Sequence, residues 1–420
     1  MTRTVKTIPS PSRAPSVPKL AIVVSHPIQH FAPFYRALTE DGRVHPIVIF
    51  ASHRGVEPYF DEGMQTMISW NMDLLGGYEH VFLPEADQIT SSRPLDVNNP
   101  SIAAELARQA PDAVLIYGYN QLTSLRALWW SRRNKIPALM IADSELKTPR
   151  SARTKLVKGT TVPSILKQFA AFLTVGDCNE DYYRRYGVDD QRFFRSPFTI
   201  DEDTYREARA RRVALREAVR AEYRIGEDEI VALTVGKLSE RKRARDVVDA
   251  ARRLKADGAV PELSFLLAGN GEVMDELTKT VARENLPVRL PGFINVDRLA
   301  GLYAAADMIL HPSSRDPHPL VMSEASCVGL PLVISDRVGA AGPTDIARQG
   351  ENAIVFPCAN VTAIADAIGT LARDNSRRAA MGARSKDIFD ELDMRCSVEG
   401  AVRAVKHAVS EANRKPEAAA

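Results

Sequence analysis

The sequence has almost no charge imbalance, few cysteines and no long apolar run, and each lack excludes a class of protein. Its 420 residues carry 55 Lys and Arg against 53 Asp and Glu, a formal net charge of +2, whereas a dedicated nucleic-acid-binding domain is usually strongly basic. No C-x-x-C pair occurs among Cys178, Cys327, Cys358 and Cys396, which indicates a reducing compartment. No apolar stretch reaches the roughly 18 to 20 residues of a membrane-spanning helix. The sequence therefore predicts a cytoplasmic protein with no nucleic-acid partner.

The chain length predicts two domains. At 420 residues the chain exceeds one ordinary domain and suits two hydrophobic cores of about 200 residues each. Residues 1–18 are basic and rich in Pro and Ser but lack the apolar core of a signal peptide, so we expect a disordered tail there. A first domain is expected over 19–200, a second over 201–390, and a C-terminal helix and tail over 391–420.

Short apolar runs alternate with helical patterns in both halves. The strands expected in the first half are 20–24, 46–50, 113–117, 138–142 and 170–175. Those expected in the second half are 230–235, 263–268, 307–311, 331–335 and 353–356. Alternation of this kind favours parallel sheets covered by helices on both faces. The predicted fold class is α/β, with two Rossmann-like doubly wound domains facing a central cleft, where ligands bind at the carboxyl ends of the strands.

The most informative segment is a loop and helix over residues 311–328. The free N–H groups at the helix start, around Leu320 and Val321, are a natural seat for phosphate. Asp316 lies in the loop and Glu324 in the helix. Because phosphate repels a carboxylate, these two are expected to face sugar hydroxyls instead. The segment predicts a nucleotide-sugar site, with solvated surface carboxylates as the alternative.

Two further loops follow predicted strands of the second half. Gly236 permits close backbone approach, and Lys237 and Lys242, five positions apart, can converge on one diphosphate. The alternative is a solvated basic face. At the next strand end Gly269 and Gly271 stand where bulky side chains would obstruct a ligand.

Together these segments resemble the retaining GT-B glycosyltransferases of family four, also called group 1 glycosyltransferases. The family's Gly-Arg/Lys-Leu, three residues, Lys pattern is matched by 236–238 and Lys242. Its later pattern, an acidic residue followed after seven others by Glu-Ala, is matched by Asp316, Glu324 and Ala325, and its Gly-x-Pro-x-Val run by 329–333. The similarity covers about 230–373 and is fainter in the first domain.

The resemblance implies a reaction and a role for each matched residue. Lys237 and Lys242 would hold the donor diphosphate, Glu324 the ribose hydroxyls, and Asp316 the hydroxyls of the transferred sugar. The implied reaction moves a sugar from a nucleoside-diphosphate sugar to an acceptor hydroxyl with retention of configuration, in polysaccharide or glycoconjugate biosynthesis. The acceptor would be a saccharide, a lipid-linked molecule or a protein. The lysines would take the place of a divalent ion, so no metal and no further cofactor are expected.

The chain departs from the family's pattern at three places. One is the histidine often found after a first-domain strand, which is absent here, where 141–146 reads IADSEL. The first acidic residue is Asp where Glu is usual, which shortens its reach by one methylene. The family's Gly-x-Gly is replaced by Pro-His-Pro over 317–319, which removes backbone donors. The altered loop favours, as one alternative, a non-catalytic nucleotide-sugar-binding protein. A second alternative is a sugar-nucleotide 2-epimerase, whose acid/base groups would be Asp143, Glu145 and His318.

First-domain candidates follow the strand over 20–24. His26 and Gln29 can point into the cleft, where His26 is a candidate catalytic residue and a capping or buried histidine is its alternative. His26 and His30 also have the spacing of a metal pair, but no third ligand accompanies them. Residues 150–173 mix basic and apolar side chains, which favours a basic surface helix, with peripheral contact to an anionic membrane as the alternative.

Overall fold

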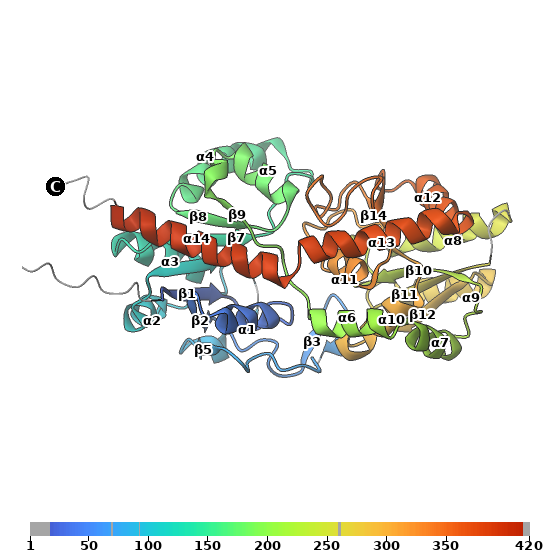
Figure 1. Ribbon diagram of the computed structural model, residues 1–420, viewed down its shortest axis with the longest axis horizontal. Helices are drawn as coiled ribbons and strands as arrows, with labels where there is room; N and C mark the ends of the chain where they lie inside the picture. The colour runs from blue at the N-terminus through green and yellow to red at the C-terminus, as the bar shows by residue number, and fades with distance from the viewer. Residues whose placement is uncertain (1–16, 69, 92, 259–261, 415–420) are drawn as a thin grey trace, which may run out of the picture.

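The computed structural model describes residues 17–414 except 69, 92 and 259–261 (Figure 1). The tail predicted over 1–18 lies outside the described residues except for its last two positions, and 415–420 also lie outside. Within the described part, no helix combines the length and apolarity needed to cross a membrane.

The first domain is built on a seven-stranded parallel sheet in the order β5-β2-β1-β6-β7-β8-β9. Its strands are β1 (Lys19–Val24), β2 (His45–Phe50), β5 (Glu79–Phe82), β6 (Ala113–Tyr117), β7 (Ala138–Ala142), β8 (Ala171–Thr174) and β9 (Phe193–Arg195). The five predicted strands are confirmed. The two edge strands, β5 and β9, are short and carry charged residues, so they lack the apolar run that marks the central strands.

The second domain is built on a six-stranded parallel sheet in the order β12-β11-β10-β13-β14-β15. Its strands are β10 (Ile230–Val235), β11 (Leu263–Ala268), β12 (Val288–Gly292), β13 (Met308–His311), β14 (Leu332–Ser335) and β15 (Ala353–Phe356). All five predicted strands are confirmed. The sequence of β12, VRLPG, contains proline and glycine, which favour a loop, and this edge strand was not predicted. The expectation of two doubly wound α/β domains is confirmed.

Helices cover both sheets. Those of the first domain are α1 (Ala32–Asp41), α2 (Ile102–Gln109), α3 (Leu122–Arg133), α4 (Ala152–Leu166) and α5 (Asp177–Arg185), with short 3-10 turns at Ala86–Gln88 and Asp190–Arg192. Those that follow are α6 (Glu202–Ala210), α7 (Arg212–Glu222), α8 (Ala244–Asp257), α9 (Met274–Glu284), α10 (Val296–Ala305), α11 (Val321–Val328), α12 (Val361–Arg373) and α13 (Asn375–Glu391). The helix start expected around Leu320 and Val321 lies at Val321, and Leu320 is the N-cap.

The last described helix, α14 (Met394–Arg414), returns to the first domain. In Figure 1, α13 lies along the second domain and α14 continues along the first. Val398, Val402 and Val405 are buried in the same apolar cluster as residues of β1 and β6. At Gly400 an added Cβ would lie 1.9 Å from the carbonyl oxygen of Arg195, so only glycine permits this contact between α14 and β9. The first domain therefore includes a helix from the far end of the chain.

The order of the strands places the loops that matter. In each sheet the chain first builds outward on one side and then on the other, so the direction reverses between β1 and β6 and between β10 and β13. The carboxyl ends of strands at such a switch point open a crevice for ligands. A small antiparallel hairpin, β3 (Tyr59–Asp61) and β4 (Thr66–Ile68), follows β2 and reaches the second domain through Asp61.

Candidate functional site

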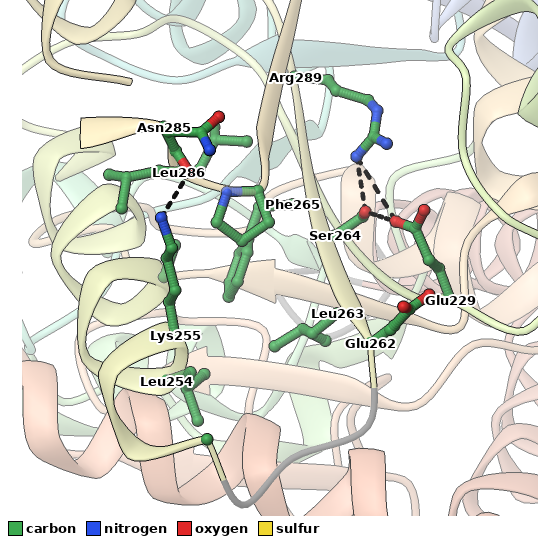
Figure 2. Close-up of a pocket in the computed structure, with 14 residues that line it drawn as sticks. Glu229, Leu254, Lys255, Glu262, Leu263, Ser264, Phe265, Asn285, Leu286 and Arg289 are labelled. Atoms are coloured by element: carbon green, nitrogen blue, oxygen red, sulfur yellow. Dashed lines mark hydrogen bonds and ion pairs between the residues drawn. The ribbon is translucent and has the colours of Figure 1, made fainter. Parts of the chain in front are cut away.

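One cavity of about 620 Å³ lies at the amino ends of β11 and β12, away from the predicted site (Figure 2). Its polar groups bond to one another: the Ser264 hydroxyl donates to Glu229 and accepts from the Arg289 guanidinium at 2.6 Å. Lys255 donates to the carbonyl oxygen of Asn285 at 2.7 Å. Because these groups already have partners, the cavity offers few unused polar groups to a ligand.

A second cavity, of about 260 Å³, lies between the domains at the carboxyl ends of β10 and β11 and brings predicted residues together. It is lined by Gly236, Gly269, Leu320 and Glu324, all four predicted from the sequence, and from the first domain by Gln29, His30 and Trp70. We call it the interdomain cavity. Val321, also predicted, packs instead against the core of the second domain.

Glu324 is held by two tyrosines. The Tyr303 hydroxyl donates to its Oε2, and Tyr205 also hydrogen-bonds to this carboxyl. Burial raises the pKa of Glu324, and the hydrogen bonds from Tyr303 and Tyr205 oppose the rise. Neither tyrosine was predicted, because each comes from a helix, α10 or α6, that is distant in the sequence. The carboxyl is therefore fixed in orientation at the wall of the interdomain cavity.

The predicted glycines allow two loops to pack closely, and they also leave room for a ligand. An added Cβ at Gly269 would lie 1.8 Å from the carbonyl oxygen of Gly236, and one at Gly271 would lie 2.4 Å from that of Leu238. Both glycines have positive φ, 152° and 155°, which side chains rarely tolerate. Gly236 itself has φ 129° and open space where a Cβ would be. Gly269 and Gly271 thus let two loops touch, while Gly236 keeps the cavity open.

Lys242 and Asp316 form an ion pair at the switch point of the second sheet. Oδ2 of Asp316 also lies 2.7 Å from Nε2 of His311, the last residue of β13. Although burial opposes it, the hydrogen bond with His311 and the charge of Lys242 hold the pKa of Asp316 well below its usual range. Burial lowers the pKa of Lys242. The spacing predicted both residues for one site but not that they bind each other.

Lys237 reaches across to the first domain. Its Nζ lies 2.6 Å from Oδ1 of Asp61, at the end of β3, and its side chain is 38% exposed. The hairpin passes so close that an added Cβ at Gly63 would lie 2.6 Å from the same Nζ. No sequence signal marked Asp61, because a pair separated by 176 residues leaves no periodic pattern. The cation predicted to bind diphosphate is thus paired with a carboxylate of the first domain.

His30, and not His26, lines the interdomain cavity. Nδ1 of His26 lies 2.8 Å from the hydroxyl of Ser25, and burial, with the charge of Arg54, lowers the pKa of His26 to about 4. Burial and the neighbouring His26 lower the pKa of His30 to about 3. Both rings are therefore neutral near pH 7. Among the described residues, no group of three or more His, Cys, Asp or Glu side chains is placed to hold a metal ion.

The residues named for epimerase chemistry have separate tasks. Glu145 is 4% exposed and accepts hydrogen bonds from the backbone N–H, at 2.9 Å, and the hydroxyl of Thr148. His318 is buried with Nε2 3.2 Å from Oδ1 of Asp345, and Asp345 in turn accepts from the first N–H of α5. Of the three, Asp143 keeps its carboxylate open to a cavity. Glu145 and His318 thus already have hydrogen-bond partners, although the charges of both also act on the carboxyl of Asp143.

Curated proteins are similar to part of the chain. N-acetyl-alpha-D-glucosaminyl L-malate synthase of Bacillus anthracis is 26% identical over 169 residues, which is 40% of this chain and 43% of that protein. The lipopolysaccharide core biosynthesis glycosyltransferase LpsE of Rhizobium meliloti (strain 1021) is 30% identical over 162 residues, 38% of this chain and 44% of that protein. The matched region spans less than half the length of either relative.

The whole fold has solved counterparts. HepE of Anabaena, in complex with UDP-glucose, aligns over 92% of this chain and 98% of its own with a TM-score of 0.66, at 15% sequence identity. This likeness confirms the predicted GT-B fold. Residues 216–388 match the family model described as glycosyl transferases group 1, and they contain Gly236, Lys237, Lys242, Asp316 and Glu324. The second domain of this chain is therefore similar to the group 1 glycosyl transferases.

Proposed function

We propose that this protein transfers a sugar from a nucleoside-diphosphate sugar to an acceptor hydroxyl with retention of configuration, in glycoconjugate or polysaccharide biosynthesis. The observation that carries the proposal is the interdomain cavity, where Glu324 and Gly236 meet beside Lys237. HepE, which shares the fold, is known with UDP-glucose bound, and the relatives' names describe glycosyl transfer. The proposal is therefore supported by the family, the fold and the local chemistry.

In the proposed mechanism the protein stabilises charge that grows on the departing diphosphate. Lys237 and Lys242 supply fixed cations, and Glu324 accepts hydrogen bonds from the ribose hydroxyls. Charges held in place before the reaction need no reorganisation as the transition state forms. Asp316 contacts hydroxyls of the transferred sugar, and the leaving phosphate receives the acceptor proton. A cytoplasmic location, consistent with four free cysteines, is part of the proposal.

A panel of nucleotides and nucleotide sugars tests the proposal by thermal unfolding. A ligand at 100 times its dissociation constant stabilises the folded state by about 2.7 kcal/mol, so the true donor should raise the melting temperature above that seen with the free nucleoside. Transfer of the labelled sugar to an acceptor extract should follow. If no nucleotide sugar stabilises the protein, the proposed donor class is wrong.

Two other functions give different products with that donor. Incubation without an acceptor would yield a new sugar nucleotide from an epimerase, whereas a glycosyltransferase should give only slow hydrolysis. A non-catalytic binding protein, the function favoured by the Pro317-His318-Pro319 loop, would show binding with neither hydrolysis nor transfer. Chromatography of the nucleotide sugar after incubation separates the three outcomes.

Glu324→Gln should raise the Michaelis constant for the donor about tenfold and change turnover less. A ribose contact is made similarly in the ground and transition states, so it contributes to binding in both, and a hydrogen bond to a charged group is worth about 1.5 to 3 kcal/mol. Steady-state kinetics measure both constants, with Glu217→Gln on the exposed face of α7 as the matched control. An unchanged Michaelis constant with abolished turnover would instead indicate that Glu324 takes part in the chemistry.

Asp61→Asn should tighten donor binding about two- to fivefold. The donor diphosphate and Asp61 compete for Lys237, and partly exposed ion pairs contribute roughly 0.2 to 1 kcal/mol. Titration calorimetry with the preferred donor measures the change. Glu62→Gln, one residue further along the same hairpin and exposed, is the control. Weaker binding in Asp61→Asn would show that Asp61 assists the donor and does not compete with it.

Activity should persist in excess EDTA, with a loss of less than about twofold. In the proposed site, Lys237 and Lys242 do the neutralising that a divalent ion does in other enzymes. Transfer assays with EDTA, and with Mg²⁺ or Mn²⁺ added back, check this. Complete loss that metal restores would contradict the assignment of the two lysines.

Peripheral contact of α4 with an anionic membrane is a separate hypothesis that can be tested. The outer face of α4 exposes Leu156 by 72% and Val157 by 53%, beside Arg153 and Lys155. Basic and apolar side chains together favour an anionic membrane surface. Co-sedimentation with anionic vesicles tests it, and Leu156→Ser should abolish binding if α4 is the contact. Equal sedimentation with neutral vesicles would contradict an electrostatic contribution.

A further inference from the structure

A third cavity, of about 600 Å³, opens at the carboxyl ends of β6 and β7 in the first domain. It is lined there by Tyr119, Asn120 and Asp143, on one side by Lys158 of α4, and from the second domain by Arg315. Its residues differ from those of the interdomain cavity except for His30, which lines both. The two cavities therefore adjoin at His30. We call this space the first-domain cavity.

Three cations face the first-domain cavity: Arg150, Lys158 and Arg315. Over the described part of the chain, none of the three has a carboxylate within ion-pair distance, whereas Arg195, for example, lies within 3 Å of both Asp177 and Glu180. Lys158 contacts the ring of Tyr182 at 5.7 Å. Burial lowers the pKa of Lys158, and the charges of Arg150 and Arg315 lower it further. The three positive groups are thus close enough to repel one another.

The two carboxylates of the cavity compensate these cations only in part. The charge of Glu145 opposes the lowering of the Lys158 pKa, but among the described residues no ion pair joins a carboxylate to any of the three. Glu145 is buried and accepts both hydrogen bonds from Thr148, so its oxygens are already used. Although the carboxylate of Asp143 lines the cavity, burial raises its pKa. The charge of His318 lowers this pKa, and the charges of Asp316 and Glu145 raise it. One side of the cavity is therefore positive, and the side near Asp316 offers a carboxylate.

The remaining walls suit a polar molecule with hydroxyl groups. Tyr119 and Asn120 supply polar groups, and the Tyr119 and Tyr182 hydroxyls share a hydrogen bond of 2.8 Å. Phe31 and Phe198 offer aromatic surface on which an apolar face of a sugar ring can pack. Guanidinium and ammonium groups bind phosphate or carboxylate oxygens through charge-assisted hydrogen bonds. A ligand with an anionic group at one end and hydroxyls at the other fits this arrangement.

We propose that the acceptor is an anionic hydroxyl compound whose phosphate or carboxylate group binds between Arg150, Lys158 and Arg315 in the first-domain cavity. The assignment of this ligand as the acceptor rests on the proposed glycosyl transfer. The anion site itself is inferred from the geometry of the cavity. The attacking hydroxyl faces the end of the cavity that His30 shares with the interdomain cavity. Because Arg315 precedes Asp316, an anion held there also fixes the loop that carries the sugar contact.

Orthophosphate is the first probe, measured by thermal unfolding against chloride at matched ionic strength. The double variant Arg150→Gln/Lys158→Gln is compared with Arg153→Gln/Lys155→Gln, which likewise removes one arginine and one lysine, from exposed positions of α4. Both variants keep Lys237 and Lys242, so phosphate binding at the donor site and general salt effects cancel between them. The apparent affinity for phosphate should fall at least about tenfold in the first variant and stay within about twofold in the second. Equal responses in both variants would overturn the proposal.

Glucose 6-phosphate, glycerophosphoglycerol and neutral glucose then distinguish the source of the anion by calorimetry. Tighter binding of glucose 6-phosphate indicates a free phosphorylated saccharide, and tighter binding of glycerophosphoglycerol indicates a lipid headgroup. In either case the Arg150→Gln/Lys158→Gln variant should lose the preference over glucose. Binding of glucose as tight as that of both anions would overturn the proposal. Retained stabilisation by the preferred nucleotide sugar shows that the variant is folded and tests the donor site separately.

Discussion

Lys237→Ala will lower turnover of the preferred nucleotide sugar about a hundredfold while leaving the protein folded. That is the usual scale for removing one preorganised group that stabilises developing charge. Lys237 follows β10 at the edge of the cleft, and its side chain is 38% exposed with Asp61 as its ion-pair partner. The apolar core does not depend on it. Turnover under saturating donor and acceptor measures the effect, and thermal unfolding checks the fold.

Lys279→Ala is the matched control for this result. Lys279 lies on the exposed side of α9 in the same domain, so loss of a lysine there should leave turnover within about twofold, as for most surface substitutions. If the turnover of Lys237→Ala equals that of this control, Lys237 is an ordinary surface lysine and the proposed stabilisation of the diphosphate is wrong.

The other large effect is expected at the pair formed by Lys242 and Asp316. Lys242→Ala should lower turnover about a hundredfold, on the same grounds as Lys237→Ala. Asp316→Asn keeps the shape but removes charge-assisted hydrogen bonds, so catalytic efficiency should fall about ten- to a hundredfold. Because the two side chains are in contact, the double variant should lose less than the sum of the single effects in free energy. Steady-state kinetics of all three variants measure this.

Asp316→Glu tests the geometry of the same pair. If the carboxylate faces the transferred sugar, one added methylene should change the relative efficiency of donors that share a nucleotide but differ in sugar stereochemistry. Affinity for the free nucleoside diphosphate should remain the same. Asp316 would lie outside the donor site if both of its variants used every donor in the wild-type order and at the wild-type rate.

The sequence predicts strands that are continuous apolar runs. It misses strands that depend on pairing with a neighbouring strand. The central strands, such as β10, are buried runs between helical segments, and such runs are visible in composition alone. The edge strand β12 contains Pro291 and Gly292 and is stabilised by its pairing with β11, which the local sequence does not reveal. The same distinction applies within the candidate site.

Residues of the site are predictable where a local motif requires them. Gly236 follows a strand end and Glu324 lies near a helix start, where ligands commonly bind. Both residues line one cavity in the structure. Asp61 and Tyr303 meet their partners, Lys237 and Glu324, only after folding. The three cations of the first-domain cavity come from two domains, so no sequence window contains them all. Long-range pairing of this kind leaves no periodicity to detect.

The return of α14 to the first domain sets an order for biosynthesis. Domains generally fold as units during synthesis, the N-terminal one first. Here the apolar face of the first sheet is covered in part by Val398, Val402 and Val405, which the ribosome adds only after the whole second domain. Part of the apolar face of the first sheet therefore stays exposed while the second domain forms. A chain that stops before residue 394 would complete the domain made last and leave unfinished the one made first.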